Sequence, residues 1–92
     1  MKIQVKNLKS SNGNLVPNQF EINVNYVYYF QSYQTIIAKI DETKSIPVLT
    51  LDINALNYSR TTSKYLYNWL RMNRKEIENK IKAKEIKLRN LN

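Results

Sequence analysis

The 92-residue sequence has no cysteine and no histidine, and it contains a single glycine. Without cysteine the chain can form no disulfide, and it offers neither a thiolate metal ligand nor a thiol nucleophile. Without histidine it lacks the usual general base and the commonest zinc ligand. One glycine also excludes a glycine-rich phosphate-binding loop. We therefore expect a binding protein that is not an enzyme and that uses no metal or other cofactor.

Acidic side chains are also scarce, with seven Asp and Glu against 15 Lys and Arg and a formal net charge of +8. The excess is uneven. Residues 1–59 hold five lysines and four acids, whereas residues 60–92 hold ten Lys and Arg and three glutamates, so the net charges are +1 and +7. This asymmetry predicts an anionic partner for the last third of the chain. The alternative is a solvated helical surface that only keeps the protein soluble.

No run of residues is long and apolar enough to cross a bilayer, and the alternating segment 2–6 does not resemble a secretory signal. We expect no membrane association and a location in the cytoplasm of the cell that makes the protein. The length suits a single domain over residues 1–92, mainly β in 1–53 and mainly α and basic in 58–92. The sequence leaves the oligomeric state open.

Alternating apolar and polar residues predict a β-rich first half. Strands are expected over residues 2–8, 19–25, 27–32, 35–40 and 46–53. The dipeptides Asn12-Gly13 and Asn25-Tyr26 are suited to tight turns. Residues 19–25 predict a half-buried strand, with Phe20, Ile22 and Val24 on its apolar face.

The period changes to a helical one from Thr62 to Met72. Its apolar face comprises Tyr65, Leu66, Trp69, Leu70 and Met72. Asn73 followed by Glu76 then indicates the capping arrangement of a second helix. In the tail, Ile86 and Leu88 favour a final short strand, although a helical stripe also fits. Strands followed by helices predict an α+β fold: an antiparallel sheet of about four to five strands with one or two C-terminal helices on one face.

The outer face of the first helix carries the main candidate site. If the helix continues far enough, a turn of 100° per residue places five cations and one tyrosine on the side opposite the apolar face. These are Arg60, Lys64, Tyr67, Arg71, Arg74 and Lys75. Such a stripe could follow a phosphate backbone, with the tyrosine stacking on a base. It would equally suit an acidic groove on a protein.

Two further features are weaker candidates. Ser59, Thr61 and Thr62 place hydroxyls at the expected helix N-terminus and could form an anion cradle, although simple N-capping accounts for them better. Tyr26, Tyr28, Tyr29 and Tyr33 crowd one expected hairpin and could contact a partner. Tyrosine is also simply a good strand former.

Several segments resemble a family of small proteins encoded by phages and mobile elements of low-GC bacteria. The most specific segment is Tyr58-Ser59-Arg60-Thr61-Thr62-Ser63-Lys64-Tyr65, and the likeness extends over residues 18–70. The sequence departs from the family pattern at 27–29, which is unusually aromatic, and at Lys84, where a glycine turn is expected. The resemblance implies no catalytic residue. It implies a protein that acts by binding, for example as an inhibitor of a host defence complex or as a small regulator.

Three functions are consistent with these features. The first is inhibition of a host defence complex, such as a CRISPR effector, through the basic helix and the tyrosine-rich hairpin. The second is direct binding of DNA or RNA by the same helix, although no helix-turn-helix, zinc module or zipper is evident. The third is a protein–protein interaction module that contacts no nucleic acid. The expected partner is thus a host protein or ribonucleoprotein complex, or nucleic acid.

Overall fold

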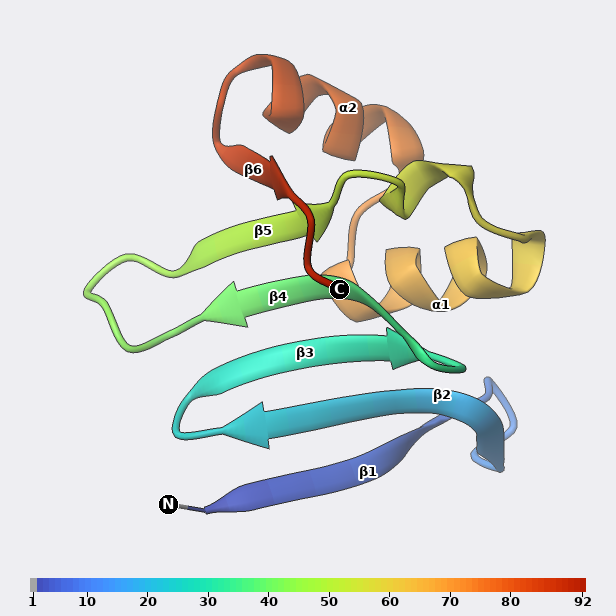
Figure 1. Cartoon of the computed structure of the whole chain (residues 1–92). Coiled ribbons are helices and arrows are strands. Elements are labelled where there is room, and N and C mark those ends of the chain that lie inside the picture. Colours follow the sequence, from blue (N-terminus) through green and yellow to red (C-terminus); the bar gives the residue numbers. More distant parts are fainter. Residues whose placement is uncertain (1) are drawn as a thin grey trace.

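The computed structural model describes residues 2–92, which form a six-stranded sheet and two helices (Figure 1). The strands are β1 (Ile3–Lys9), β2 (Leu15–Val24), β3 (Val27–Ser32), β4 (Thr35–Asp41), β5 (Val48–Asp52) and β6 (Ile86–Arg89). The helices are α1 (Arg60–Leu70) and α2 (Arg74–Lys82), and a short 3₁₀ turn, η1 (Ala55–Asn57), precedes α1. The α+β class predicted from the sequence is confirmed.

The strands lie in the sheet in their order along the chain, from β1 at one edge to β6 at the other. The first five strands pair antiparallel, but β6 pairs parallel to β5. The four to five antiparallel strands expected over residues 2–53 are five, and the final short strand favoured for the tail is present as β6, which makes six strands in all; the parallel direction of β6 was not predicted. The physical reason is the connection. Because the chain crosses one face of the sheet as two helices before it returns, β6 runs in the same direction as β5.

The turn between β2 and β3 has the backbone that the sequence predicts. Asn25 and Tyr26 both have positive φ, 49° and 67°, as a two-residue hairpin turn requires. Strand β2 begins at Leu15, earlier than expected, because its first residues extend the pairing with β1 before β3 joins at Gln19.

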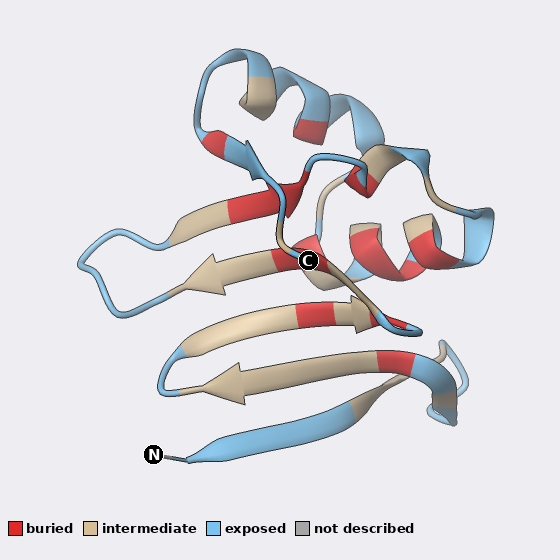
Figure 2. Ribbon diagram, viewed as in Figure 1, coloured by how far each residue is buried: buried red, intermediate tan, exposed pale blue. Residues whose placement is uncertain are grey.

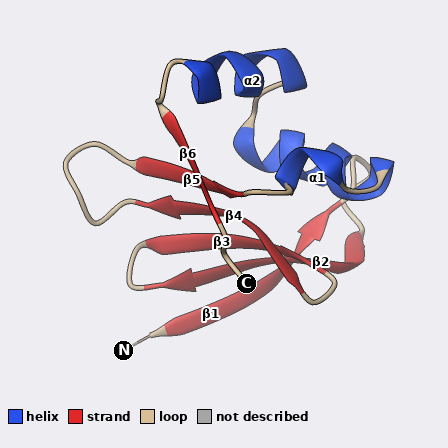
Figure 3. Ribbon diagram, turned by 45° about the horizontal axis from the view of Figure 1, so that its top comes forward, coloured by secondary structure: helices blue, strands red, loops and turns tan. Residues whose placement is uncertain are grey.

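Both helices pack on the same side of the sheet (Figure 3), and the buried residues gather between α1 and the central strands (Figure 2). Tyr65, Leu66 and Leu70 of α1 are buried, which confirms the apolar face expected for this helix. The Phe30 and Trp69 rings lie 5.9 Å apart, centroid to centroid. In α2, Ile77 is fully buried, and Asn73 and Glu76 form the expected capping box.

Strand β2 turns its more polar face to the helices. Glu21 bonds to Trp69 of α1, so the side chains at 19, 21 and 23 point to the helical layer. Phe20, Ile22 and Val24 therefore lie on the opposite face, which carries no helix. The half-buried antiparallel strand is confirmed, but its more apolar face is not the one that packs against the helices. Alternation separates two faces of a strand, but it does not say which one a helix will cover.

Candidate anion-binding surface

The N-terminus of α1 is closed by its own side chains. The Ser59 Oγ accepts a hydrogen bond from the backbone N–H of Thr62 at 3.3 Å, which makes Ser59 the N-cap. The Thr62 hydroxyl is buried and lies 2.9 Å from the hydroxyl of Ser32 on β3. These contacts favour capping over an anion cradle of Ser59, Thr61 and Thr62, since two of the three hydroxyls are already engaged within the fold.

Helix α1 ends earlier than the proposed cationic stripe requires. Its last residue is Leu70, and Arg71 takes a left-handed conformation with φ of 57° as the C-cap. The 100° advance per residue therefore stops before Arg71, and the chain restarts as α2 at Arg74. The prediction of one continuous helical stripe from Arg60 to Lys75 was wrong for this reason. Arg60, Lys64 and Tyr67 remain on a single helix.

The fold nevertheless brings four of the six stripe residues together. A concavity of about 520 Å³ lies between η1, α1 and the start of α2. Its lining residues are Leu56, Tyr58, Arg60, Ser63, Lys64, Tyr67, Asn68 and Arg74. Three of these are cations, two are tyrosines and none is acidic. We refer to this surface as the basic concavity. The reversal of the chain at Arg71 is what allows Arg74 to approach Arg60 and Lys64 across it.

Arg74 is held in place at one wall of the basic concavity. Its Nη1 donates to the backbone carbonyl of Leu56 at 3.3 Å, and its Nε lies 3.7 Å from a carboxylate oxygen of Glu78. Both side chains of this pair are about half exposed, at 52% and 48%, so the pair positions the guanidinium more than it neutralises it. Within residues 2–92, Arg60 and Lys64 form no ion pair, and the Lys64 Nζ lies 5.6 Å from the centre of the Tyr65 ring.

The two remaining stripe residues lie elsewhere. Arg71 lines a neighbouring hollow of about 580 Å³ with Tyr67, Asn68, Met72, Asn73 and Glu76. It shares Tyr67 and Asn68 with the basic concavity, so the two hollows adjoin. Lys75 is exposed and lines neither of them. We therefore separate Arg71 and Lys75 from the core of the candidate site.

The four hairpin tyrosines do not form one patch. Tyr26 and Tyr33 are exposed in turns at opposite ends of β3. Tyr28 shares the helical side of the sheet with Phe30, while Tyr29 lies on the other side, because side chains alternate along a strand. Residues 26–33 therefore present no single aromatic surface, and contact of the individual tyrosines with a partner stays a prediction.

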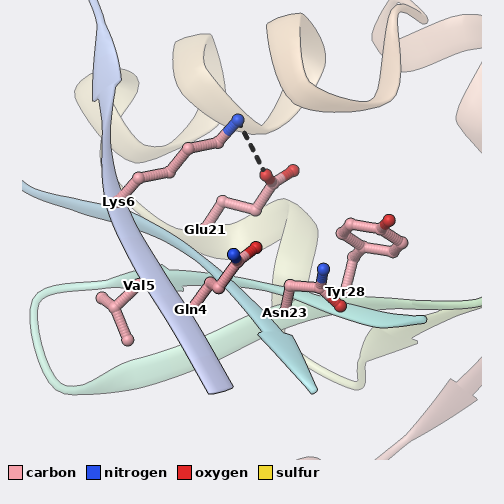
Figure 4. A pocket seen from close by; sticks show the side chains of 6 residues that line it. All are labelled: Gln4, Val5, Lys6, Glu21, Asn23 and Tyr28. Carbon is pink, nitrogen blue, oxygen red and sulfur yellow. Dashed lines mark ion pairs between the residues drawn. The ribbon is translucent and has the colours of Figure 1, made fainter. Parts of the chain in front are cut away.

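A second concavity, of about 590 Å³, lies over β1, β2 and β3 on the helical side of the sheet (Figure 4). Gln4, Lys6, Glu21, Asn23 and Tyr28 point into it, and Val5 points to the other face. Its only cation and only acid are paired with each other, with the Lys6 Nζ 3.2 Å from the Glu21 carboxylate. This concavity is therefore less suited to an anion than the basic concavity.

Asp52 is a buried carboxylate that no pattern in the sequence indicated. Asp52 is 2% exposed and accepts hydrogen bonds from the backbone N–H groups of Leu91 and Asn54 and from the side chains of Asn92 and Tyr58. Burial raises the pKa of Asp52, but these hydrogen bonds outweigh burial, and its pKa lies below the ordinary value. Burial and the nearby Asp52 charge raise the pKa of Tyr58. Asp52 therefore secures the C-terminal tail.

Two general findings concern the part of the chain from Lys2 onward. It contains no cluster of three or more acidic side chains that could hold a metal ion. Neither α1, with 11 residues, nor α2, with nine, is long enough to span a bilayer.

Residues 3–87 match the model of a family of unknown function, DUF8033. The chain belongs to DUF8033. No curated protein and no solved structure matches it significantly. The DUF8033 match covers all six strands at least in part and both helices, so the basic concavity lies wholly within the family region.

Proposed function

We propose that this DUF8033 protein binds nucleic acid through the basic concavity. The observation that carries the proposal is the convergence of Arg60, Lys64 and Arg74, from two helices, on one hollow whose lining includes no acid. Phosphate oxygens are the natural ligands of such a group, because guanidinium and ammonium donors form charge-assisted hydrogen bonds with them.

Two tyrosines favour a single strand or an unpaired segment over a continuous duplex. Tyr58 and Tyr67 line the same hollow as the three cations. An aromatic ring next to phosphate-binding groups supports stacking of an unpaired base, and such stacking tolerates any sequence. The proposed activity is therefore binding with little sequence preference.

Fluorescence anisotropy with labelled single-stranded RNA, single-stranded DNA and duplex DNA tests this proposal. The variant Arg60→Gln/Lys64→Gln should weaken single-strand binding about tenfold at low salt. The matched control is Lys2→Gln/Lys44→Gln, which removes the same charge from two exposed lysines far from the basic concavity. If the two variants weaken binding equally, net charge and not the concavity is responsible, and the proposal fails.

A narrower proposal concerns the biological partner. The resemblance to small phage and mobile-element proteins supports a role in the bacterial cytoplasm as an inhibitor of a host defence ribonucleoprotein, with the basic concavity docked on its RNA or DNA. Affinity purification from an expressing host, with and without nuclease treatment, tests this form. A defence nuclease recovered only without nuclease treatment supports it. Recovery of bulk nucleic acid with no such complex, across several hosts, leaves only the general binding activity.

A further inference from the structure

A second basic hollow lies at the other end of α2 from the basic concavity. It has a volume of about 360 Å³ and is formed by the last turn of α2, the turn that follows it and strand β6 (Figure 1). Its lining residues are Ile81, Lys84, Ile86, Lys87, Leu88 and Arg89. Three of these are cations, three are apolar and none is acidic. We refer to this surface as the β6 hollow.

The acids nearest to the β6 hollow do not neutralise its three cations. Within residues 2–92, none of these cations forms an ion pair. Asp52 lies opposite Arg89 in the β5–β6 pairing, but its buried carboxylate already accepts four hydrogen bonds within the fold. Glu85 is exposed in the turn before β6 and does not line the hollow. The positive charge is therefore available to an external anion.

The edge of β6 is better suited to an anion than to an added peptide strand. The carbonyl of Arg89 accepts a hydrogen bond from the N–H of Ile53, next to β5, so the carbonyl of the neighbouring Leu88 points away from the sheet. Arg89 Nη1 donates to that outward carbonyl at 2.7 Å. This contact and the length of four residues make the edge a poor template for strand pairing. A guanidinium has five N–H donors, so most of them remain for a phosphate.

Helix α2 connects the two basic hollows. Arg74, in its first turn, lines the basic concavity, and Ile81, near its end, lines the β6 hollow. Seven residues at about 1.5 Å each separate them by roughly 10 Å along the axis. A turn of about 100° per residue places Lys75 and Lys82 on the outward side of α2, opposite the buried Ile77. Two exposed lysines therefore lie between the hollows.

The two glutamates of α2 do not interrupt this outward line. Asn79 is the residue that lies on it between the two lysines, since residues four and three apart share a helix face. Glu76 accepts a hydrogen bond from the backbone N–H of Asn73 in the capping box, and Glu78 pairs with Arg74. Both acids are thus engaged beside the line.

We propose that the β6 hollow is a second phosphate-binding site for the same single strand, which passes along α2 from one hollow to the other. This inference rests on the proposed binding of nucleic acid by the basic concavity. A separation of roughly 10 Å corresponds to about three stacked nucleotide steps of 3.4 Å, so the bound strand is several nucleotides long. One strand that joins two weak sites binds more tightly than either contact alone, because the second contact is intramolecular.

Two thymidine oligonucleotides, a dinucleotide with a 5′ phosphate and a strand of twelve nucleotides, test the two sites separately and together. The dinucleotide is too short to reach both hollows. NMR titration with it therefore reports on each hollow through its own backbone amides, Ser63 and Asn68 for the basic concavity and Lys87 and Leu88 for the β6 hollow. We expect both groups of amides to shift. Fluorescence anisotropy with the labelled twelve-nucleotide strand measures the combined affinity.

Lys87→Gln/Arg89→Gln should weaken binding of the twelve-nucleotide strand about tenfold at low salt, and should change dinucleotide affinity at the basic concavity less than about twofold. The matched control is Lys2→Gln/Lys9→Gln, which removes the same charge from two exposed lysines at the opposite edge of the sheet and should weaken the long strand less than about twofold. Circular dichroism shows whether each variant is folded. If the first variant does not fold, Lys84→Gln/Lys87→Gln replaces it, because that variant keeps the contact of Arg89.

Four results would overturn the inference. Equal weakening in Lys87→Gln/Arg89→Gln and in the control would assign the effect to net charge. Dinucleotide shifts confined to the basic concavity would show that the β6 hollow takes no phosphate, and the proposed function would stand. A polyglutamate of twelve residues that binds the β6 hollow as tightly as the long strand would indicate an acidic protein partner. A long strand that binds Arg60→Gln/Lys64→Gln as tightly as the parent would refute the proposed function, and the two-site path with it.

Discussion

The indole N–H of Trp69 on α1 donates a hydrogen bond of 2.9 Å to the carboxylate of Glu21 on β2, 48 residues earlier in the chain. The other oxygen of that carboxylate lies 3.2 Å from the Lys6 Nζ on β1. One partly buried acid thus connects the first helix, which supplies five of the eight residues that line the basic concavity, to strands β1 and β2. This contact also decides which face of β2 turns to the helices.

Trp69→Phe should therefore destabilise the protein by about 2 kcal/mol. The substitution removes the indole N–H that donates to the Glu21 carboxylate, and it replaces the indole that packs on Phe30 by a smaller ring. Glu21→Gln keeps an acceptor for the indole and loses only an ion pair whose lysine is 73% exposed, so it should cost less than about 1 kcal/mol. Urea unfolding of both variants checks the order. If both variants lose the same free energy of unfolding, the hydrogen bond between Trp69 and Glu21 is not the main contact between α1 and β2.

The hydrogen-bonded carboxylate of Asp52 should make the folded protein less stable in acid. Its pKa is lowered in the folded chain, so its contribution is fully present above the ordinary aspartate pKa and is lost as pH falls through the folded value. The free energy of unfolding should decline below about pH 4. In Asp52→Asn it should be about 2 kcal/mol lower at pH 7 and should depend less on pH in the acid range. A variant with the same acid slope as the parent would contradict this assignment.

Lys84→Gly should stabilise the protein by about 1 kcal/mol. Lys84 has φ of 61°, a conformation in which any side chain is strained and glycine is not. Lys82→Gly, two residues earlier and within α2, is the matched control and should cost about 1 kcal/mol. Thermal unfolding measures both. The glycine turn that the family resemblance led us to expect at 84 is thus present as a backbone conformation, although the residue is lysine.

Ser59→Ala tests capping against anion binding. As the N-cap of α1, Ser59 should contribute about 1 kcal/mol to stability, seen in urea unfolding. If its hydroxyl only caps the helix, affinity for single-stranded nucleic acid should change less than about threefold at a temperature where the variant is folded. A large loss of affinity in a well-folded Ser59→Ala protein would show that the Ser59 hydroxyl contacts the anion, and it would support the anion cradle over simple capping.

Local signals in the sequence predicted most elements of the fold. The Asn73–Glu76 capping box, the Asn25–Tyr26 turn and the apolar face of α1 depend on neighbouring residues, and all three are confirmed. The covered face of β2 was not predictable in the same way. Phe20, Ile22 and Val24 are the more apolar set, yet Glu21 faces the helices because Trp69, far away in the chain, supplies its donor.

The candidate site was predicted in its residue types and only partly in its geometry. Arg71 ends α1 in a left-handed conformation that the sequence would signal most clearly with glycine, and arginine gave no such sign. The helical projection was therefore extended beyond Leu70, where α1 ends. The same reversal brings Arg74 back to Arg60 and Lys64, a tertiary convergence that no helical period contains.

The salt dependence of nucleic-acid binding tests the central claim most directly. Each phosphate contact contributes about −0.7 to the slope of log K against log salt for single strands. Arg60→Gln/Lys64→Gln should therefore make the slope about 1.4 less steep than that of the parent, while Lys2→Gln/Lys44→Gln leaves it unchanged. Parallel lines for the parent and Arg60→Gln/Lys64→Gln would contradict a phosphate-binding role for the basic concavity.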